Sequence, residues 1–153
     1  MQRLATIGYQ SATPDSFKRA LRDARIQLLV DIRAVASSRR PGFSKTKLAA
    51  SVADVGIDYL HLRALGTPAE GRAAARAGHH AEMRAIFLEH MSTPGAQSGL
   101  EDLAQLVRAG RRVCLLCFEA DPAHCHRSIV ASMLADRLPL EIAHLIPDVD
   151  SLH

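Results

Sequence analysis

The sequence contains no tryptophan and few aromatic residues, and this shortage limits the ligands that it is built to bind. Only 4% of its 153 residues are Phe, Trp or Tyr. Proteins that hold single-stranded nucleic acid stack its bases on aromatic side chains, so we do not expect a surface of that kind. Basic residues outnumber acidic ones by 19 to 16, a formal net charge of +3, but most arginines are spread along the chain. Nucleic acid therefore stays a candidate partner without being the leading one.

The sequence also lacks the features of a secreted, membrane-bound or dinucleotide-binding protein. Three cysteines are too few, and odd in number, for a disulfide scaffold, so we expect reduced thiols. No apolar run approaches the ~18 residues that cross a bilayer, and the first residues, MQRLATIGYQ, do not resemble a secretory signal. No G-x-G-x-x-G turn follows the first apolar segment. We therefore expect a cytoplasmic protein with no membrane partner and no cofactor, while its oligomeric state is not indicated.

The sequence does contain alternating strand and helix patterns along its whole length. The expected strands are residues 4–8, 26–32, 57–62, 112–118 and 141–146. The expected helices lie between them, with starts signalled by the cap residues Thr13 and Ser44 and by a Ser98-x-x-Glu101 capping box. Residues 64–79 have no clear period, and we predict a mobile excursion or lid there.

Strands that alternate with helices predict a parallel sheet. Residues 26–32 are apolar without alternation, as in a strand that is buried on both faces. We therefore predict a single domain over residues 1–153, of the three-layer α/β/α class. Its mostly parallel five-stranded sheet has the Rossmann-like order 3-2-1-4-5, with strands numbered along the chain.

In such a sheet ligands bind beyond the carboxyl ends of the strands. This rule brings together three segments, residues 8–11, 31–40 and 117–127, where the unusual polar residues are concentrated. We predict that the substrate-binding residues are Gly8, Ser11, Arg33, Ser38, Arg39, Cys117 and Arg127. Arginine forks bind phosphate or carboxylate groups, and we expect the arginines at the rim of one cleft. The partner is then an anionic small molecule or nucleic acid, although an internal pair of Arg33 with Asp31 is the alternative.

The same segments supply candidate catalytic residues, namely Asp31, Glu119, Cys125 and His126. Asp31 and Glu119 follow buried strands, where partial burial favours general acid or base chemistry. Cys125 lies at a helix start between two histidines, an environment that favours a thiolate nucleophile. A Cys-x5-Arg phosphatase loop is excluded, because no cysteine in the segment has arginine six positions later.

Metal binding at the cysteines is not favoured by their spacing. Cys117, Cys125 and His126 are soft ligands, but Cys-x7-Cys-His matches no usual zinc motif. Cys114 and Cys117 lie three apart in an expected strand and so face opposite sides of it. We predict no metal, although a structural or metal-holding turn remains a third interpretation of the motif.

Short motifs across the chain carry a resemblance to one family. They are Thr6-Ile7-Gly8, Val30-Asp31-Ile32-Arg33, Ser38-Arg39, Gly56-Ile57 with Tyr59 and His61, Leu65-Gly66, Leu116-Cys117-Phe118-Glu119, Asp121-Pro122 and Cys125-His126-Arg127. With these the chain resembles the domain of unknown function 488 family, a group of uncharacterised bacterial and archaeal cytoplasmic α/β proteins. The sequence departs from the family pattern at Ala36, where proline is usual, and at Thr67, where a second glycine is usual. The resemblance marks the same motif residues and assigns no reaction.

Three functions are therefore considered. The leading one is an enzyme that acts on a nucleotide, a nucleic-acid component or another phosphate-bearing substrate, with Asp31 or Glu119 as acid or base. The alternative is a non-catalytic module that binds nucleic acid or a nucleotide with the same arginines. The third is the structural or metal-holding turn.

Overall fold

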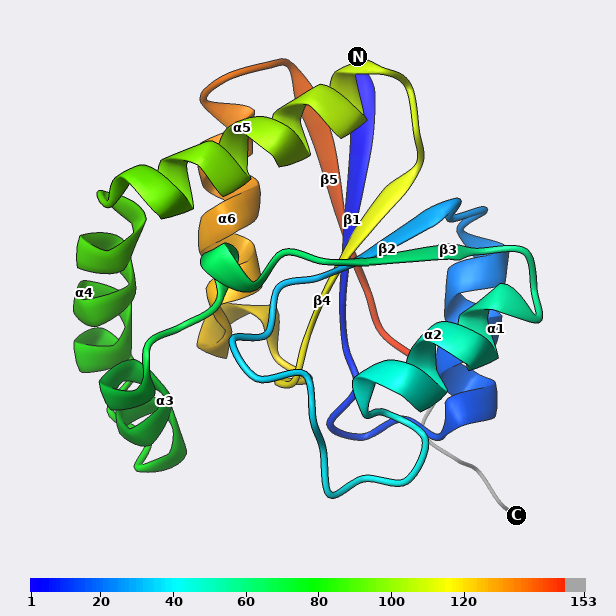
Figure 1. Ribbon diagram of the computed structural model, residues 1–153, viewed down its shortest axis with the longest axis horizontal. Coiled ribbons are helices and arrows are strands. Elements are labelled where there is room, and N and C mark those ends of the chain that lie inside the picture. The colour runs from blue at the N-terminus through cyan, green and yellow to red at the C-terminus, as the bar shows by residue number, and fades with distance from the viewer. Residues whose placement is uncertain (148–153) are drawn as a thin grey trace.

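A computed structural model describes residues 1–147 as a five-stranded parallel sheet with helices on both faces (Figure 1). The strands are β1 (Gln2–Gly8), β2 (Leu28–Asp31), β3 (Asp58–His61), β4 (Val113–Cys117) and β5 (Leu140–Leu145). The helices are α1 (Pro14–Asp23), α2 (Lys45–Ala53), α3 (Ala69–Arg76), α4 (His80–Met91), α5 (Pro94–Arg108) and α6 (His126–Ala135), with short 3₁₀ helices η1 (Arg63–Leu65) and η2 (Pro122–His124). The predicted three-layer α/β fold with a parallel sheet is confirmed. Of the helices in this part of the chain, none has the length and apolarity needed to cross a bilayer.

The order of the strands differs from the prediction. The sheet runs β3-β2-β4-β1-β5, so the predicted order 3-2-1-4-5 is wrong in placing β1 beside β2. Leu116 of β4 pairs with Ile7 of β1 on one side and with Asp31 of β2 on the other. The inner part of β1 and all of β4 are buried, so their apolarity does not indicate which is central. The carboxyl ends of β1, β2 and β4 still adjoin one another.

Alternate residues of the strands face two separate cores. Val113, Leu115 and Cys117 of β4 pack with the helices α3 to α6. Cys114 and Leu116 pack on the other face with α1 and α2, and Figure 1 shows these two groups of helices on opposite sides of the sheet. Cys114 and Cys117 are therefore on opposite faces, as their spacing in a strand predicts.

The segment predicted as a mobile excursion, residues 64–79, folds as η1 followed by α3. Helix α3 packs against α4, and a Cβ atom at Gly71 would crowd the side chains of Thr67 and Ile86. A glycine here therefore permits the close approach. The structure supplies a helix where no period was visible, and movement of this segment stays a prediction.

The helix starts were predicted correctly at α1 and incorrectly at α5. Thr13 caps α1, because its side chain accepts from the Ser16 amide and the Ser16 hydroxyl accepts from the Thr13 amide. Helix α5 begins at Pro94 with Thr93 as its cap, so Ser98 lies inside the helix. Proline in the first turn, followed by small residues, is compatible with a helix. The helix start was predicted at Ser98 instead because Ser98 and Glu101 match a capping box.

Candidate functional site

Asp31 is the last residue of β2, and its carboxylate is completely buried. Arg33 donates from Nε to Oδ1 at 2.9 Å and from Nη2 to Oδ2 at 2.7 Å, and the Tyr59 hydroxyl also donates to Oδ2. Nη1 of Arg33 donates to the Tyr9 hydroxyl at 3.2 Å and to the Phe43 carbonyl at 2.7 Å. Burial opposes the charge of Arg33, but the hydrogen bonds and charge of Asp31 outweigh it and raise its pKa. The internal pair is confirmed, and it leaves Asp31 enclosed.

Arg127 lies inside the molecule and not at the rim where the sequence predicts it. The side chain is fully buried. Its Nε donates to Thr6 Oγ1 at 3.1 Å, its Nη1 to the Glu119 carbonyl, and its Nη2 to the Ala120 carbonyl at 3.2 Å. A Cβ atom at Gly8 would overlap that same Glu119 carbonyl. The rim placement is therefore wrong, because Arg127 and Gly8 hold the loop after β4 against β1.

Cys117 ends β4, Cys125 precedes α6, and His126 is the first residue of α6; all three are buried. The sulfur atoms of Cys117 and Cys125 lie in disulfide contact, which corrects the expectation of reduced thiols, because a strand end and a helix start meet here. In this state Cys125 offers no free thiolate, and its role as a nucleophile stays a prediction for the reduced protein.

His126 is held between the two sulfurs and a backbone carbonyl. Its Nδ1 lies 3.6 Å from Cys117 Sγ and 3.9 Å from Cys125 Sγ, and its Nε2 lies 2.8 Å from the Ile32 carbonyl oxygen. Burial lowers the pKa of His126 to about 4, so the ring is neutral at pH 7. Beside the two sulfurs, a neutral imidazole can act as a base or as a metal ligand, but not as a positively charged group.

A pocket of about 520 Å³ opens at the carboxyl ends of β2 and β4. Seven of the sequence-predicted residues line it: Arg33, Ser38, Arg39, Cys117, Glu119, Cys125 and His126. The other four, Gly8, Ser11, Asp31 and Arg127, do not appear among its lining residues. The residues that sequence reasoning missed include Tyr9, Arg40, Thr67, Arg72, Arg76, Met83, Phe118 and His124. The loops after β2 and β4 therefore meet at this pocket as expected, whereas the part of the pocket wall that α3 forms was not predicted.

The pocket carries an excess of arginine. Arg40 donates to two backbone carbonyls in the loop after β1, and Arg72 donates from Nη1 to the Thr67 carbonyl at 2.9 Å. Arg39 and Arg76 are exposed. Within residues 1–147 none of these four guanidinium groups forms an ion pair with a carboxylate. The pocket therefore presents arginine side chains that have no carboxylate at ion-pair distance within residues 1–147.

Glu119 is the one carboxyl-bearing residue among those that line the pocket. It is half-buried, and burial raises the pKa of its carboxyl, which the charges of His80, His124 and Arg127 partly oppose. The rings of His80 and His124 stack 4.0 Å apart. Glu119 thus lines the pocket, whereas Asp31 is enclosed by Arg33 and Tyr59.

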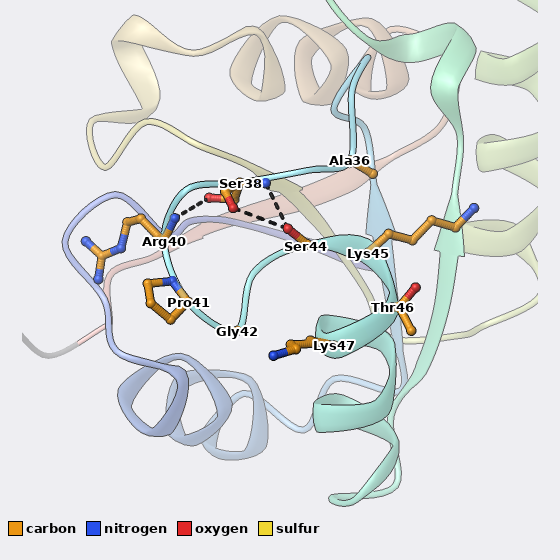
Figure 2. A pocket seen from close by; sticks show the side chains of 9 residues that line it. All are labelled: Ala36, Ser38, Arg40, Pro41, Gly42, Ser44, Lys45, Thr46 and Lys47. Carbon is orange, nitrogen blue, oxygen red and sulfur yellow. Dashed lines mark hydrogen bonds between the residues drawn. The ribbon is translucent and has the colours of Figure 1, made fainter.

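A second pocket, of about 460 Å³, lies beside the loop that joins β2 to α2, at the start of α2 (Figure 2). Ser44 Oγ accepts from the Ser38 amide at 3.0 Å, and Ser38 Oγ accepts from the Arg40 amide at 3.1 Å. Ser44 precedes α2 but makes no side-chain cap. Ser38 and Arg40 line both pockets, so this hydrogen-bonded loop is their common wall.

Comparison with models of known protein families gives a match. A family model described as domain of unknown function DUF488 matches residues 13–134, a range that includes the loop after β2, the loop after β4 and most of α6. No curated protein matches the sequence.

Proposed function

This chain belongs to the DUF488 family, and we propose that it is an enzyme acting on a small phosphate-bearing molecule, such as a nucleotide, in the pocket between α3 and the carboxyl ends of β2 and β4. The single observation that carries the proposal is a set of arginines around one pocket that have no carboxylate partner within residues 1–147. The arginines come from two segments, the loop after β2 and the helix α3.

An anionic ligand is supported by the chemistry of these side chains. Guanidinium groups bind phosphate through paired N-H donors. Arg39 and Arg76 are the most available, because Arg33 is occupied by Asp31 and Arg40 by backbone carbonyls. A phosphate held between Arg39 and Arg76 would bridge the loop and α3, and the pair is the anion clamp of the proposal.

The size of the pocket favours a small molecule over a polymer. Pockets for small ligands usually measure ~300–1,000 Å³, and this one is about 520 Å³. Phe118, which is 40% exposed, also lines it and offers ring surface to an apolar or aromatic portion of the ligand. A nucleotide has both parts.

Glu119 supplies the proposed chemistry as the general acid or base. Its carboxyl lines the pocket together with Arg39 and Arg76. The alternative function, binding without turnover, uses the same arginines and gives Glu119 no chemical role. Glu119→Gln separates the two: it abolishes turnover if the protein is an enzyme and leaves anion binding intact in both cases.

The test is thermal unfolding in the presence of mononucleotides, sugar phosphates, inorganic phosphate and short oligonucleotides. A ligand at 100 times its dissociation constant stabilises a protein by about 2.7 kcal/mol, which shifts the Tm of a domain of this size by several degrees. The variant Arg39→Gln/Arg76→Gln should lose the shift, and Arg22→Gln, an exposed arginine on α1, should keep it. A Tm shift that persists in the double variant would contradict the proposal that Arg39 and Arg76 bind the phosphate. A Tm shift with oligonucleotides alone would favour the non-catalytic binding module.

A further inference from the structure

We propose that Cys117, Cys125 and His126, in the dithiol form of the protein, bind one soft metal ion, with Zn²⁺ as the first candidate. One ligand atom from each residue lies within 4.8 Å of the others, and all three residues are buried. The site does not rest on the function proposed above, because it uses none of the arginines and requires no phosphate ligand.

The hydrogen bond on the far side of the imidazole fixes which nitrogen faces the sulfurs. A carbonyl oxygen can only accept, so Nε2 of His126 must donate its N-H to the Ile32 carbonyl, 2.8 Å away. The other ring nitrogen, Nδ1, then carries a lone pair directed toward Cys117 and Cys125. Metal-binding histidines are usually oriented in this way, by a backbone carbonyl or carboxylate on the second nitrogen.

The distances between nitrogen and sulfur fit a shared tetrahedral ion. With Zn–S of ~2.3 Å and Zn–N of ~2.05 Å, a tetrahedral angle places nitrogen and sulfur about 3.6 Å apart. Nδ1 of His126 lies 3.6 Å from Cys117 Sγ and 3.9 Å from Cys125 Sγ. These separations occur while the two sulfurs are in disulfide contact, so reduction must let the sulfurs part before both can bind the ion.

The Cα atoms of the two cysteines lie slightly farther apart than is usual for a disulfide, which suits a bridging ion once the pair is reduced. Disulfides usually join Cα atoms that are ~4.4–6.8 Å apart, and the Cα atoms of Cys117 and Cys125 are 7.1 Å apart. Two thiolates on one tetrahedral ion have sulfurs about 3.8 Å apart, which requires a wider Cα separation. Reduction of the sulfur pair by a thiol reductant adds two electrons and two protons, and binding of a divalent ion then releases those two protons to solvent.

The surroundings leave one side of the proposed ion open. The Phe87 ring lies 5.0 Å from the His126 ring and covers it from α4. Cys117, Cys125 and His126 all line the pocket of about 520 Å³, so the fourth coordination position faces that pocket. Three protein ligands with an open fourth position are typical of catalytic zinc rather than structural zinc.

The measurement is metal analysis of protein purified with a thiol reductant and without chelator, then supplied with Zn²⁺ or Co²⁺. We expect about one ion per chain, and a Co²⁺ spectrum with thiolate-to-metal charge transfer. Cys117→Ser and Cys125→Ser should each lose the ion and the band. The matched control is Cys114→Ala, which removes the free cysteine on the opposite face of β4. This variant should retain both the bound ion and the charge-transfer band.

Thiol counting on the wild type needs no variant to fold. Protein denatured without reductant after metal loading should titrate as three thiols. A count of one, matching Cys114 alone, together with no bound metal, would show a stable disulfide and overturn the proposal. Binding that persists in Cys117→Ser and Cys125→Ser would overturn it as well, because the ion would then lie elsewhere.

Discussion

The side chains of Arg33 and Arg39 lie six residues apart in one segment and have opposite surroundings. Arg33 is 6% exposed and makes two hydrogen bonds with the carboxylate of Asp31. Arg39 is exposed, and within residues 1–147 it has no carboxylate partner. A buried ion pair that loses one member leaves an uncompensated charge, whereas an exposed cation is stabilised by water whether or not it has a partner.

Replacing these two arginines should therefore change stability by very different amounts. Arg33→Met leaves the buried carboxylate of Asp31 unpaired and should lower the free energy of unfolding by about 3–5 kcal/mol. Arg39→Met should change it by no more than about 0.5 kcal/mol. Urea unfolding of both variants beside the wild type is the measurement. Equal effects would show that the Asp31 pair contributes nothing beyond an ordinary surface contact.

Residue by residue, the sequence predicts the members of the site better than their orientations. Cys117, Cys125 and His126 were expected at one cleft because a strand end and a helix start adjoin there, and all three line the pocket. Arg127 was expected beside them, but the next residue of a helix points about 100° away, here back toward β1. Arg76 was missed because an Ala- and Arg-rich segment gives no indication of where its helix docks.

At the scale of the helices, the start of α5 provides a contrast between a true cap and an apparent one. Thr93 lies before Pro94, and its hydroxyl accepts from the Ala96 amide. Ser98 has the letters of a capping box with Glu101 but lies exposed within the helix. A serine inside a helix offers no cap and has a lower helix propensity than alanine.

Alanine substitutions at these two positions should have opposite effects. Thr93→Ala removes a cap and should destabilise the protein by about 1 kcal/mol. Ser98→Ala replaces a weak helix former with the best one and should be neutral or stabilising by up to about 0.5 kcal/mol. Chemical unfolding measures both. A larger loss for Ser98→Ala than for Thr93→Ala would place the helix start where the sequence pattern predicts it.

The strands show how far patterns of apolar residues can specify a sheet. All five strands lie within two residues of their predicted bounds, because each lies between turn and helix signals and the buried ones are short apolar runs. The exchange of β1 and β4 in the order was not predictable in this way. Both are buried on two faces, and the rule that crossovers are right-handed permits either to lie beside β2.

For the molecule as a whole, a buried thiol and a half-buried phenol, at the core between the sheet and α1 and α2, link folding to alkaline pH. Burial raises the pKa of the Cys114 thiol. Burial, with the hydrogen bond to Asp31, raises the pKa of the Tyr59 hydroxyl. In the unfolded chain a thiol ionises near pH ~8.5 and a phenol near pH ~10. The folded protein therefore retains two protons at pH values where the unfolded chain has lost them.

The free energy of unfolding should accordingly fall as pH rises, first above about 8.5 and more steeply above about 10, by up to about 1.4 kcal/mol per pH unit for each group. The contribution of each group is complete below its unfolded pKa and is lost as pH rises toward its folded pKa. Cys114→Ala should flatten the first part of the fall and Tyr59→Phe the second, although Tyr59→Phe is also less stable at neutral pH because Asp31 loses a donor. Urea unfolding across this pH range measures how the free energy of unfolding changes with pH. Any contribution of Cys117 and Cys125 cancels when the proteins are compared, because every variant retains both residues. Parallel curves for the wild type and both variants would mean that neither group keeps its proton in the folded protein.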